Sequence, residues 1–279
     1  MARTDAFSML DGAAGKASLA EAYGGVIDGI QKSALSAQLK TTRYSGDATT
    51  GSVEVARFKN SASKTYGTAR TAGAGDKLAN AAVTINLSTK KEIVEEVENN
   101  DALLGTVSGI IGSRTGDHAK TLIRELDTAF FTAITSLSGA EVAPAVLVGD
   151  LEGQLEEVIQ SLETKSNNYV DGIDRDMITV TMLPAVYGAL RTKFDTIIGV
   201  NGESITSYHG VRVASNHRQA KDFVAVVEGS VAQPVVVKAY APTNIELSDA
   251  AAICLFYQYG TKVVAEDLVA WSTLSTATS

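Results

Sequence analysis

The chain has 279 residues, of which 45% are apolar and 20% are charged, so it can bury a sizeable core and is not a disordered protein. Its formal net charge is -8, which disfavours general nucleic-acid binding, because phosphate contacts need clustered Lys and Arg. A single cysteine, Cys254, excludes an intrachain disulfide, and without a membrane-length apolar run or a secretory signal we expect a chain that stays in a reducing cytoplasm.

The first predicted element is an amphipathic helix over residues 16–40. Its stripe of apolar residues is thin, which indicates an arm that packs on something else rather than a core helix. The stripe recurs at three- and four-residue spacing and consists of Leu19, Tyr23, Val26, Ile27, Ile30 and Leu35.

Residues 43–91 are rich in Gly, Ser, Thr and Ala and contain two short alternating runs. Val53, Val55 and Phe58 form the first run, and the second covers residues 83–87. Both runs predict strands, and the polar, basic stretch between them predicts a long antiparallel hairpin with a loose tip. An isolated two-stranded ribbon is marginal in water, so this hairpin should lie against a neighbouring molecule.

The strongest helical pattern follows. It begins at the possible N-caps of residues 99–101 and continues to about Leu137, with four glycines that predict a bend or break in its first half. A second amphipathic helix is predicted over residues 150–162. A buried strand at residues 177–183 then leads into a helix that Pro184 opens, which indicates an α/β unit.

The last third of the sequence is rich in strands. β-Branched and aromatic runs cover residues 223–227, 235–240 and 251–259, and residues 259–264 predict a turn beside a sheet. No internal repeat is present, so a solenoid is not expected.

No catalytic pattern passes a test of spacing and context. Residues 12–18 fail the phosphate-loop spacing and favour a flexible arm, and Ser108 lies inside a helical pattern rather than at a strand-to-helix turn. The three histidines lack metal-site spacing, and Cys254 lies in an apolar strand as an inert buried thiol. The acidic loop 171–176 favours a solvated loop over a weak cation site. We therefore predict no enzyme activity, no cofactor and no metal.

Several segments, in their order along the chain, resemble the Hong Kong 97-type major capsid proteins of tailed bacteriophages. The strand-helix segment 177–191 resembles the axial-domain strand and helix of that family, and residues 208–216 resemble the strand after its glycine-containing loop. Residues 257–264 resemble the closing strand, and the hairpin segments resemble the extended loop. The resemblance covers nearly the whole chain.

This resemblance implies an α+β fold with four parts. These are an N-terminal arm at 1–42, an extended hairpin loop at 43–91, a peripheral domain with a long spine helix and a β-ribbon at 92–145 and 228–279, and an axial α/β domain at 146–227.

The resemblance also implies a function. It is that of a major capsid subunit, which forms pentamers and hexamers in an icosahedral shell around double-stranded DNA, without sequence-specific binding and without a membrane. Expected partners are a portal and, because no long charged helical segment precedes the arm, a separate scaffolding protein. The shell would assemble in the host cytoplasm and persist as the virion capsid. Two alternatives stay open: an encapsulin-type compartment, and a soluble α/β enzyme or binding domain.

The charge pattern predicts where subunits meet. The hairpin is basic and the segment leading into the long helix is acidic, so we expect the hairpin of one subunit to lie on the acidic segment of the next. A salt-bridged surface within one chain explains the same pattern equally well. The residues concerned are Arg57, Lys59, Lys64, Arg70 and Lys77 in the hairpin, and Glu92, Glu95, Glu96, Glu98 and Asp101 in the acidic segment.

Overall fold

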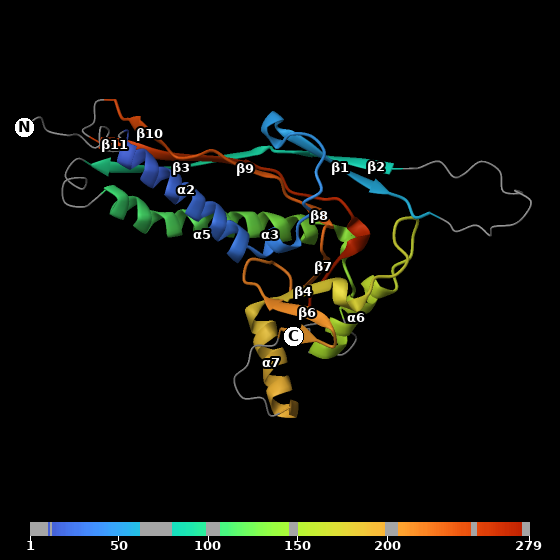
Figure 1. Cartoon of the computed structure of the whole chain (residues 1–279). Helices are drawn as coiled ribbons and strands as arrows, with labels where there is room; N and C mark the ends of the chain where they lie inside the picture. Colours follow the sequence, from blue (N-terminus) through green and yellow to red (C-terminus); the bar gives the residue numbers. More distant parts are fainter. Residues whose placement is uncertain are drawn as a thin grey trace, which may run out of the picture.

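A four-stranded antiparallel sheet forms the long upper layer of the molecule (Figure 1). Its central pair is β3 (Thr89–Glu98) and β11 (Ala250–Tyr259), which pair along their full length, while β10 (Ala241–Asn244) and β9 (Val235–Val237) share the other edge of β11. The structure, a computed structural model, describes residues 11, 13–61, 80–98, 107–144, 150–198, 206–246 and 250–274.

No strand was predicted for Glu92, Glu95, Glu96 and Glu98, which were assigned only to a segment leading into the long helix. They lie in strand β3, whose side chains alternate between two faces. The strand was missed because Val94 and Glu95 interrupt a clean apolar and polar alternation.

Two long helices cover one face of this sheet: α2 (Ala13–Ser33) and α5 (Val107–Thr135). Figure 1 shows both helices running lengthwise beneath the sheet. Leu19, Val26 and Ile30 of α2 are buried with Leu122 of α5 and with the inward side chains of β11. The prediction that this stripe packs on something other than its own core is therefore wrong, because the stripe completes the core under the sheet.

The other helical segments near the N-terminus and in the long helix differ from the predictions in detail. Segment 12–18, expected as a flexible arm, is helical from residue 13, and a short helix α3 (Leu35–Leu39) follows after Ala34. The predicted break in the long helix does not occur within α5, although Gly109, Gly112 and Gly116 lie in it. The expected caps at residues 99–101 lie outside the described residues.

The predicted hairpin is confirmed as strands β1 (Ser52–Phe58) and β2 (Asn80–Asn86) in antiparallel register. The base of the hairpin has a small core of its own, in which Val53, Val55 and Ile85 are buried against Ala232 of the same chain. Phe58 lies on the opposite face from the two valines and is exposed, contrary to its place in the predicted run. The chain's own contacts therefore fix the base of the hairpin.

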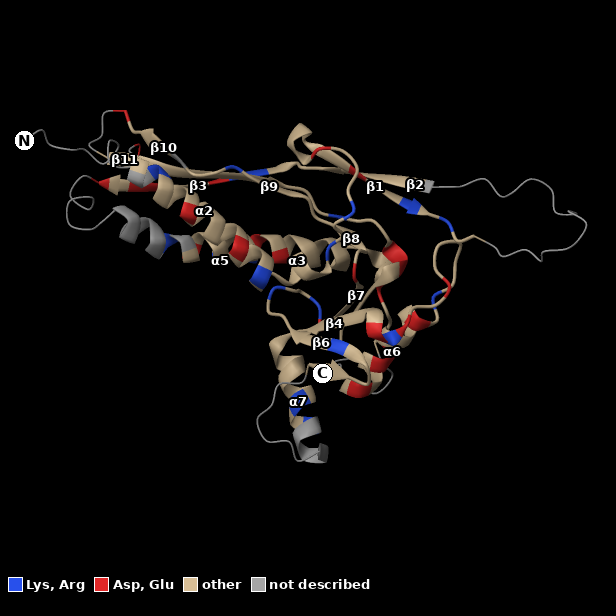
Figure 2. Ribbon diagram, in the orientation of Figure 1, with Lys and Arg blue, Asp and Glu red and all other residues tan. Residues whose placement is uncertain are grey.

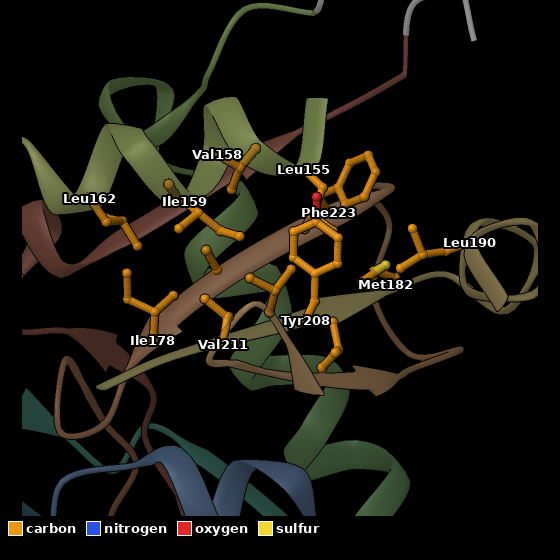
Figure 3. Packing of buried hydrophobic residues seen from close by; sticks show 14 of the residues in the cluster. Leu155, Val158, Ile159, Leu162, Ile178, Met182, Leu190, Tyr208, Val211 and Phe223 are labelled. Carbon is orange, nitrogen blue, oxygen red and sulfur yellow. The ribbon is translucent and has the colours of Figure 1, made fainter. Parts of the chain in front are cut away.

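The second unit, called the α/β unit below, lies beneath the middle of the upper layer (Figure 1). Helices α6 (Leu151–Glu163) and α7 (Pro184–Ile198) pack on one face of a five-stranded sheet, and Figure 3 shows their apolar side chains meeting those of the strands. Asp150 caps α6, and Pro184 opens α7 as predicted. The sheet order is β13 (Val269–Ser272), β7 (Phe223–Val227), β4 (Ile178–Met182), β6 (Val211–Ser215) and β5 (Ser207–Tyr208).

Short elements complete the fold. The two-residue strands β8 (Val231–Ala232) and β12 (Lys262–Val263) pair near the base of the hairpin. The 3-10 turns are η1 (Ala48–Thr50), η2 (Ser138–Ala140), η3 (Arg175–Met177) and η4 (Glu266–Leu268). Gly260 follows β11 where a Cβ would lie 2.1 Å from the carbonyl oxygen of Asn86, so only glycine lets these backbones approach.

A buried carboxylate on α5 connects the upper layer to the α/β unit and to the short helix α3. Asp127 of α5 is fully buried; its Oδ1 accepts a hydrogen bond from the Ser36 amide at 2.9 Å, and its Oδ2 lies 2.5 Å from Arg218 Nη1. The Ser36 amide is in the first turn of α3, whose own N-cap residue, Ala34, supplies no side-chain cap. Asp127 therefore caps α3 from another helix and also holds the loop between β6 and β7.

Replacing Asp127 with Ala should lower the free energy of unfolding of the free subunit by about 2–4 kcal/mol, because Arg218 and the α3 amide lose a buried charged partner. Urea unfolding measures the change. Asp117→Ala on the exposed side of the same helix is the matched control and should cost within about 0.5 kcal/mol. Equal losses for the two variants would contradict the role given to Asp127.

Candidate assembly surface

The face of the upper sheet that the helices leave uncovered is the candidate assembly surface, here called the outer sheet face. On β3 this face carries Lys90, Glu92, Val94, Glu96 and Glu98, which are all exposed. The strand register places Phe256 of β11 beside Glu92, Cys254 beside Val94 and Ala252 beside Glu96. The acidic and basic positions of this pair lie on β3 (Figure 2), because β11 contains no charged residue.

The outer sheet face combines apolar and charged groups. Val94 and Phe256 are 48% and 42% exposed and lie on the same face of two paired strands, so together they form a small apolar area on this surface. Lys90 and Lys238 flank Phe256 in a shallow hollow. An exposed apolar centre with a charged rim is the anatomy of a protein-protein contact.

Glu95 does not belong to this surface, because it points to the other face of β3. Its carboxylate accepts hydrogen bonds from Arg114 Nε at 2.8 Å and Nη2 at 2.6 Å, and it lies 3.1 Å from Nε2 of buried His118. The His118 Nδ1 and the Tyr240 hydroxyl form a further hydrogen bond. Glu95 thus fastens α5 to the sheet through contacts within the chain, which is what the alternative of an intrachain salt-bridged surface predicts for this residue.

The electrostatics of this cluster follow from burial and from its partners. Burial by itself would raise the pKa of Glu95, but hydrogen bonds from Arg114 and the nearby His118 outweigh it and hold the pKa below its ordinary value. Burial, together with the charge of Glu95, raises the pKa of Tyr240 to about 12. A second link, Lys91 to Glu125 at 2.9 Å, fastens the other end of β3 to α5.

The basic residues predicted for the hairpin separate into three groups. Lys59 is exposed, as an intersubunit contact requires. Arg57 instead forms an ion pair within the chain, with Nη2 lying 2.6 Å from Asp267 Oδ2. The third group, Lys64, Arg70 and Lys77, lies outside the described residues. Asp101 of the acidic segment also lies outside them.

The apolar part of the outer sheet face was not predicted from the sequence. Val94, Phe256 and Phe58 carry the largest exposed apolar areas near the sheet and hairpin, and only Phe58 was singled out, as a strand residue. Only once residues 90–98 are known to form a strand does it follow that every even-numbered residue among them lies on the outer face. Phe256 could not be placed without the register between β11 and β3.

Other kinds of site find no support in the part of the chain that the structure describes. No group of three or more His, Cys, Asp and Glu residues there is arranged to hold a metal ion, and this includes the loop 171–176. Cys254 is buried with a free thiol, as predicted, and Ser108 lies in α5. Within the same described ranges, none of the helices is long and apolar enough to cross a membrane.

Solved structures share this architecture. A chain from the capsid structure of cyanophage P-SCSP1u is 14% identical, with a TM-score of 0.60 over 86% of this chain and 87% of that one. A chain from the capsid of an empty GTA particle is 13% identical, with a TM-score of 0.59 over 85% and 87%. The fold is that of a phage capsid subunit.

The same fold extends to a virus-like particle from Pyrococcus furiosus, whose chain is 14% identical with a TM-score of 0.56 over 92% of this chain and 98% of that one. No protein-family model matches the sequence, and neither does any curated protein. At these identities the structural likeness establishes the capsid fold, and the function is argued below from the surface.

Neighbouring positions on β3 should respond differently to the same substitution. Glu95→Gln should lower the free energy of unfolding of the free subunit by about 1–3 kcal/mol, because it weakens charged hydrogen bonds to Arg114. Glu96→Gln, on the outer sheet face, should change it by less than about 0.5 kcal/mol. Equal effects in urea unfolding would show that β3 does not present its faces as described.

The pH dependence identifies the cause of the Glu95 effect. Because the folded-state pKa of Glu95 is below its unfolded value, its contribution is present above the unfolded pKa and disappears as the pH falls through the folded one. The stability gap between wild type and Glu95→Gln should therefore be full at pH 7 and shrink at acidic pH below the ordinary glutamate range. A gap that is constant with pH would assign the loss to packing instead.

Proposed function

We propose that this chain is the major capsid subunit of a tailed phage, with a Hong Kong 97-type fold, and that it assembles into an icosahedral shell around double-stranded DNA. The observation that carries the proposal is the capsid fold over more than four fifths of the chain together with a sheet that helices cover on one face only. A one-sided sheet with exposed Val94 and Phe256 is a surface that a neighbour would cover.

The contact we propose is between the hairpin of one subunit and the outer sheet face of the next. Phe58 is 51% exposed near the end of β1, and Lys59 follows it. An apolar contact of Phe58 with Phe256 would exclude water from both rings, and the basic residues of segment 59–77 would face the outward glutamates of β3. Charge complementarity of this kind fixes the register of a contact and speeds its formation.

Such a contact joins two different surfaces of the same chain. A contact of this heterologous type generates closed rings when the rotation between copies closes, which is how pentamers and hexamers arise. We propose the division into arm 1–42, hairpin loop 43–91, peripheral domain 92–145 and 228–279, and axial domain 146–227 on the same basis. The axial loops would then meet at the symmetry axes.

Further parts of the proposal follow from a capsid role. A portal and a separate scaffolding protein would be the partners, assembly would take place in the host cytoplasm, and the finished subunit would reside in the virion capsid. The net charge of -8 supports a wall that encloses DNA without holding it tightly. No catalytic step is part of this function.

One other shell function has an observation in its favour. The particle from Pyrococcus furiosus matches this chain over a larger share of both chains than the two phage-type capsids described above do. A protein compartment of the encapsulin type would use the same subunit contacts and differ in its contents. Purified particles that contain protein cargo and no DNA would favour the compartment, whereas packaged DNA would favour the phage capsid.

Charge reversal on the outer sheet face tests the proposed contact. The double variant Glu92→Lys with Glu96→Lys should fold normally and fail to form closed particles, because it opposes like charges to the hairpin. Circular dichroism checks folding, and sedimentation with negative-stain microscopy measures assembly. Reversing the hairpin charges in the same chain, at Lys59, Lys64, Arg70 and Lys77, should restore particles.

A matched control carries the same charge change on another exposed surface. Glu21→Lys with Asp28→Lys places two reversals on the exposed side of α2 and should leave assembly intact. Normal assembly of the Glu92 and Glu96 variant would refute the contact, as would equal loss in the control. Failure of the wild-type chain to form particles of any kind would refute the capsid function itself.

A further inference from the structure

A clamp of three chain segments holds the outer half of the hairpin. Arg57 lies in β1, Asp267 in the η4 turn near the C-terminal end, and Asn167 in the loop after α6. The Asp267 Oδ2 accepts a hydrogen bond from Arg57 Nη2 at 2.6 Å and another from Asn167 Nδ2 at 2.6 Å. One carboxylate oxygen thus ties the hairpin to the loop of the α/β unit.

Two further contacts join the same segments. The guanidinium carbon of Arg57 lies 4.3 Å from the centre of the Tyr169 ring, a distance typical of a cation-π contact. Just beyond β1, the amide of Asn60 donates a hydrogen bond to the carbonyl oxygen of Asn168 at 2.8 Å. Three consecutive residues of the loop, 167–169, therefore contact the hairpin or its partner Asp267.

The loop that supplies these contacts is itself rigidly built. The side-chain oxygen of Asn167 accepts hydrogen bonds from the amides of Tyr169 and Val170 at 2.7 and 2.9 Å, so its amide nitrogen is oriented toward Asp267. Gly172, with φ of +77°, closes the loop by donating to the carbonyl oxygen of Lys165 at 2.8 Å. The ion pair of the clamp is largely buried, since the side chains of Arg57 and Asp267 are 20% and 10% exposed, while Asn167 lies at the surface.

We infer that Arg57, Asp267 and Asn167 are positioning residues that make the hairpin and the α/β unit move as one body. The base of the hairpin is fixed by apolar contacts near β8, and without a second attachment its outer half could swing about that base. The clamp provides this second attachment on the α/β unit. The direction in which the hairpin leaves the subunit, and hence where it meets a neighbour, is thereby set by the position of the α/β unit.

This inference rests on the proposed function only in its consequence for assembly, so it can be tested in free subunits. Spin labels at Ala82→Cys in β2 and Glu157→Cys in α6, both at exposed positions, in a Cys254→Ala background report the distance between hairpin and α/β unit. Double electron-electron resonance should give a narrow distribution of label-to-label distances in the otherwise wild-type chain. Asp267→Ala should broaden it about twofold, because the hairpin then loses the carboxylate that ties it to the α/β unit and keeps only the Tyr169 and Asn168 contacts beside its basal attachment.

Two further variants make the result specific. Arg57→Gln removes the same ion pair from the hairpin side and should broaden the distribution to a similar extent. Lys193→Ala removes the α6–α7 ion pair with Glu152, away from the hairpin, and should leave the width unchanged. Thermal unfolding confirms that each variant is folded, and Arg57→Gln serves as the main test if Asp267→Ala is not.

Unchanged widths in both Asp267→Ala and Arg57→Gln would overturn the clamp, whatever the shells do. Broadening in Lys193→Ala as well would also overturn it, because the motion would then not depend on these contacts. If the variants behave as expected in free subunits but the chain forms no shells, the clamp is supported and only the capsid function is refuted.

Discussion

A sheet covered by helices on one face only is the constraint on which the rest of this structure depends. The pairing of β3 with β11 places Ile93, Val97 and the inward residues of β11 against α2 and α5, which gives the upper layer its core. Every alternate residue is then committed to the opposite face, because side chains of a strand point to the two sides in turn. Val94 and Phe256 are left exposed as a consequence, and this is where we propose that a second copy of the chain packs.

The hairpin follows the same logic in a different way. Its base is secured by the subunit's own core near Ala232, and its outer half is tied to the α/β unit through Asp267. A two-stranded ribbon that is marginal alone becomes a directed extension of the subunit once both attachments are in place. The affinity of a contact between copies is increased when the contacting element is ordered beforehand, because less conformational entropy is lost on binding.

Charged side chains that pair within the subunit stabilise the fold, whereas those on the outer sheet face are available for assembly. Asp127 and Glu95 each pair with a cationic partner from another element; Asp127 is fully buried and Glu95 is partly buried. The outward glutamates of β3 have no such partner among the described residues and remain free for a neighbour's charges. Strand β3 therefore supplies fold stability with one set of side chains and an assembly surface with the other.

The sequence predicted the elements with strong local signals. Pro184 at the start of α7, Asp150 before α6 and the alternation around Val53 and Ile85 all led to correct elements. Strand β3 was missed, because its inward positions include Glu95 and Lys91, which read as surface residues until α5 supplies their partners.

Tertiary contacts explain the errors in the predicted site. Arg57 was grouped with the free basic residues of the hairpin, since nothing near it in the sequence reveals Asp267, which lies 210 positions later. The exposure of Phe256 could not be predicted for a related reason. It depends on the register of β11 with β3, which only the folded sheet establishes. The charge pattern alone picked out the acidic segment as a candidate and could not say which of its residues face outward.

The most direct test of the account is a cryo-electron microscopy reconstruction of particles assembled from the full chain. We predict closed particles in which the hairpin of each subunit crosses the outer sheet face of a neighbour, with Phe58 near Phe256 and the hairpin's basic residues along the outward glutamates of β3. Particles in which the outer sheet face is bare, with the hairpin lying elsewhere, would contradict the account.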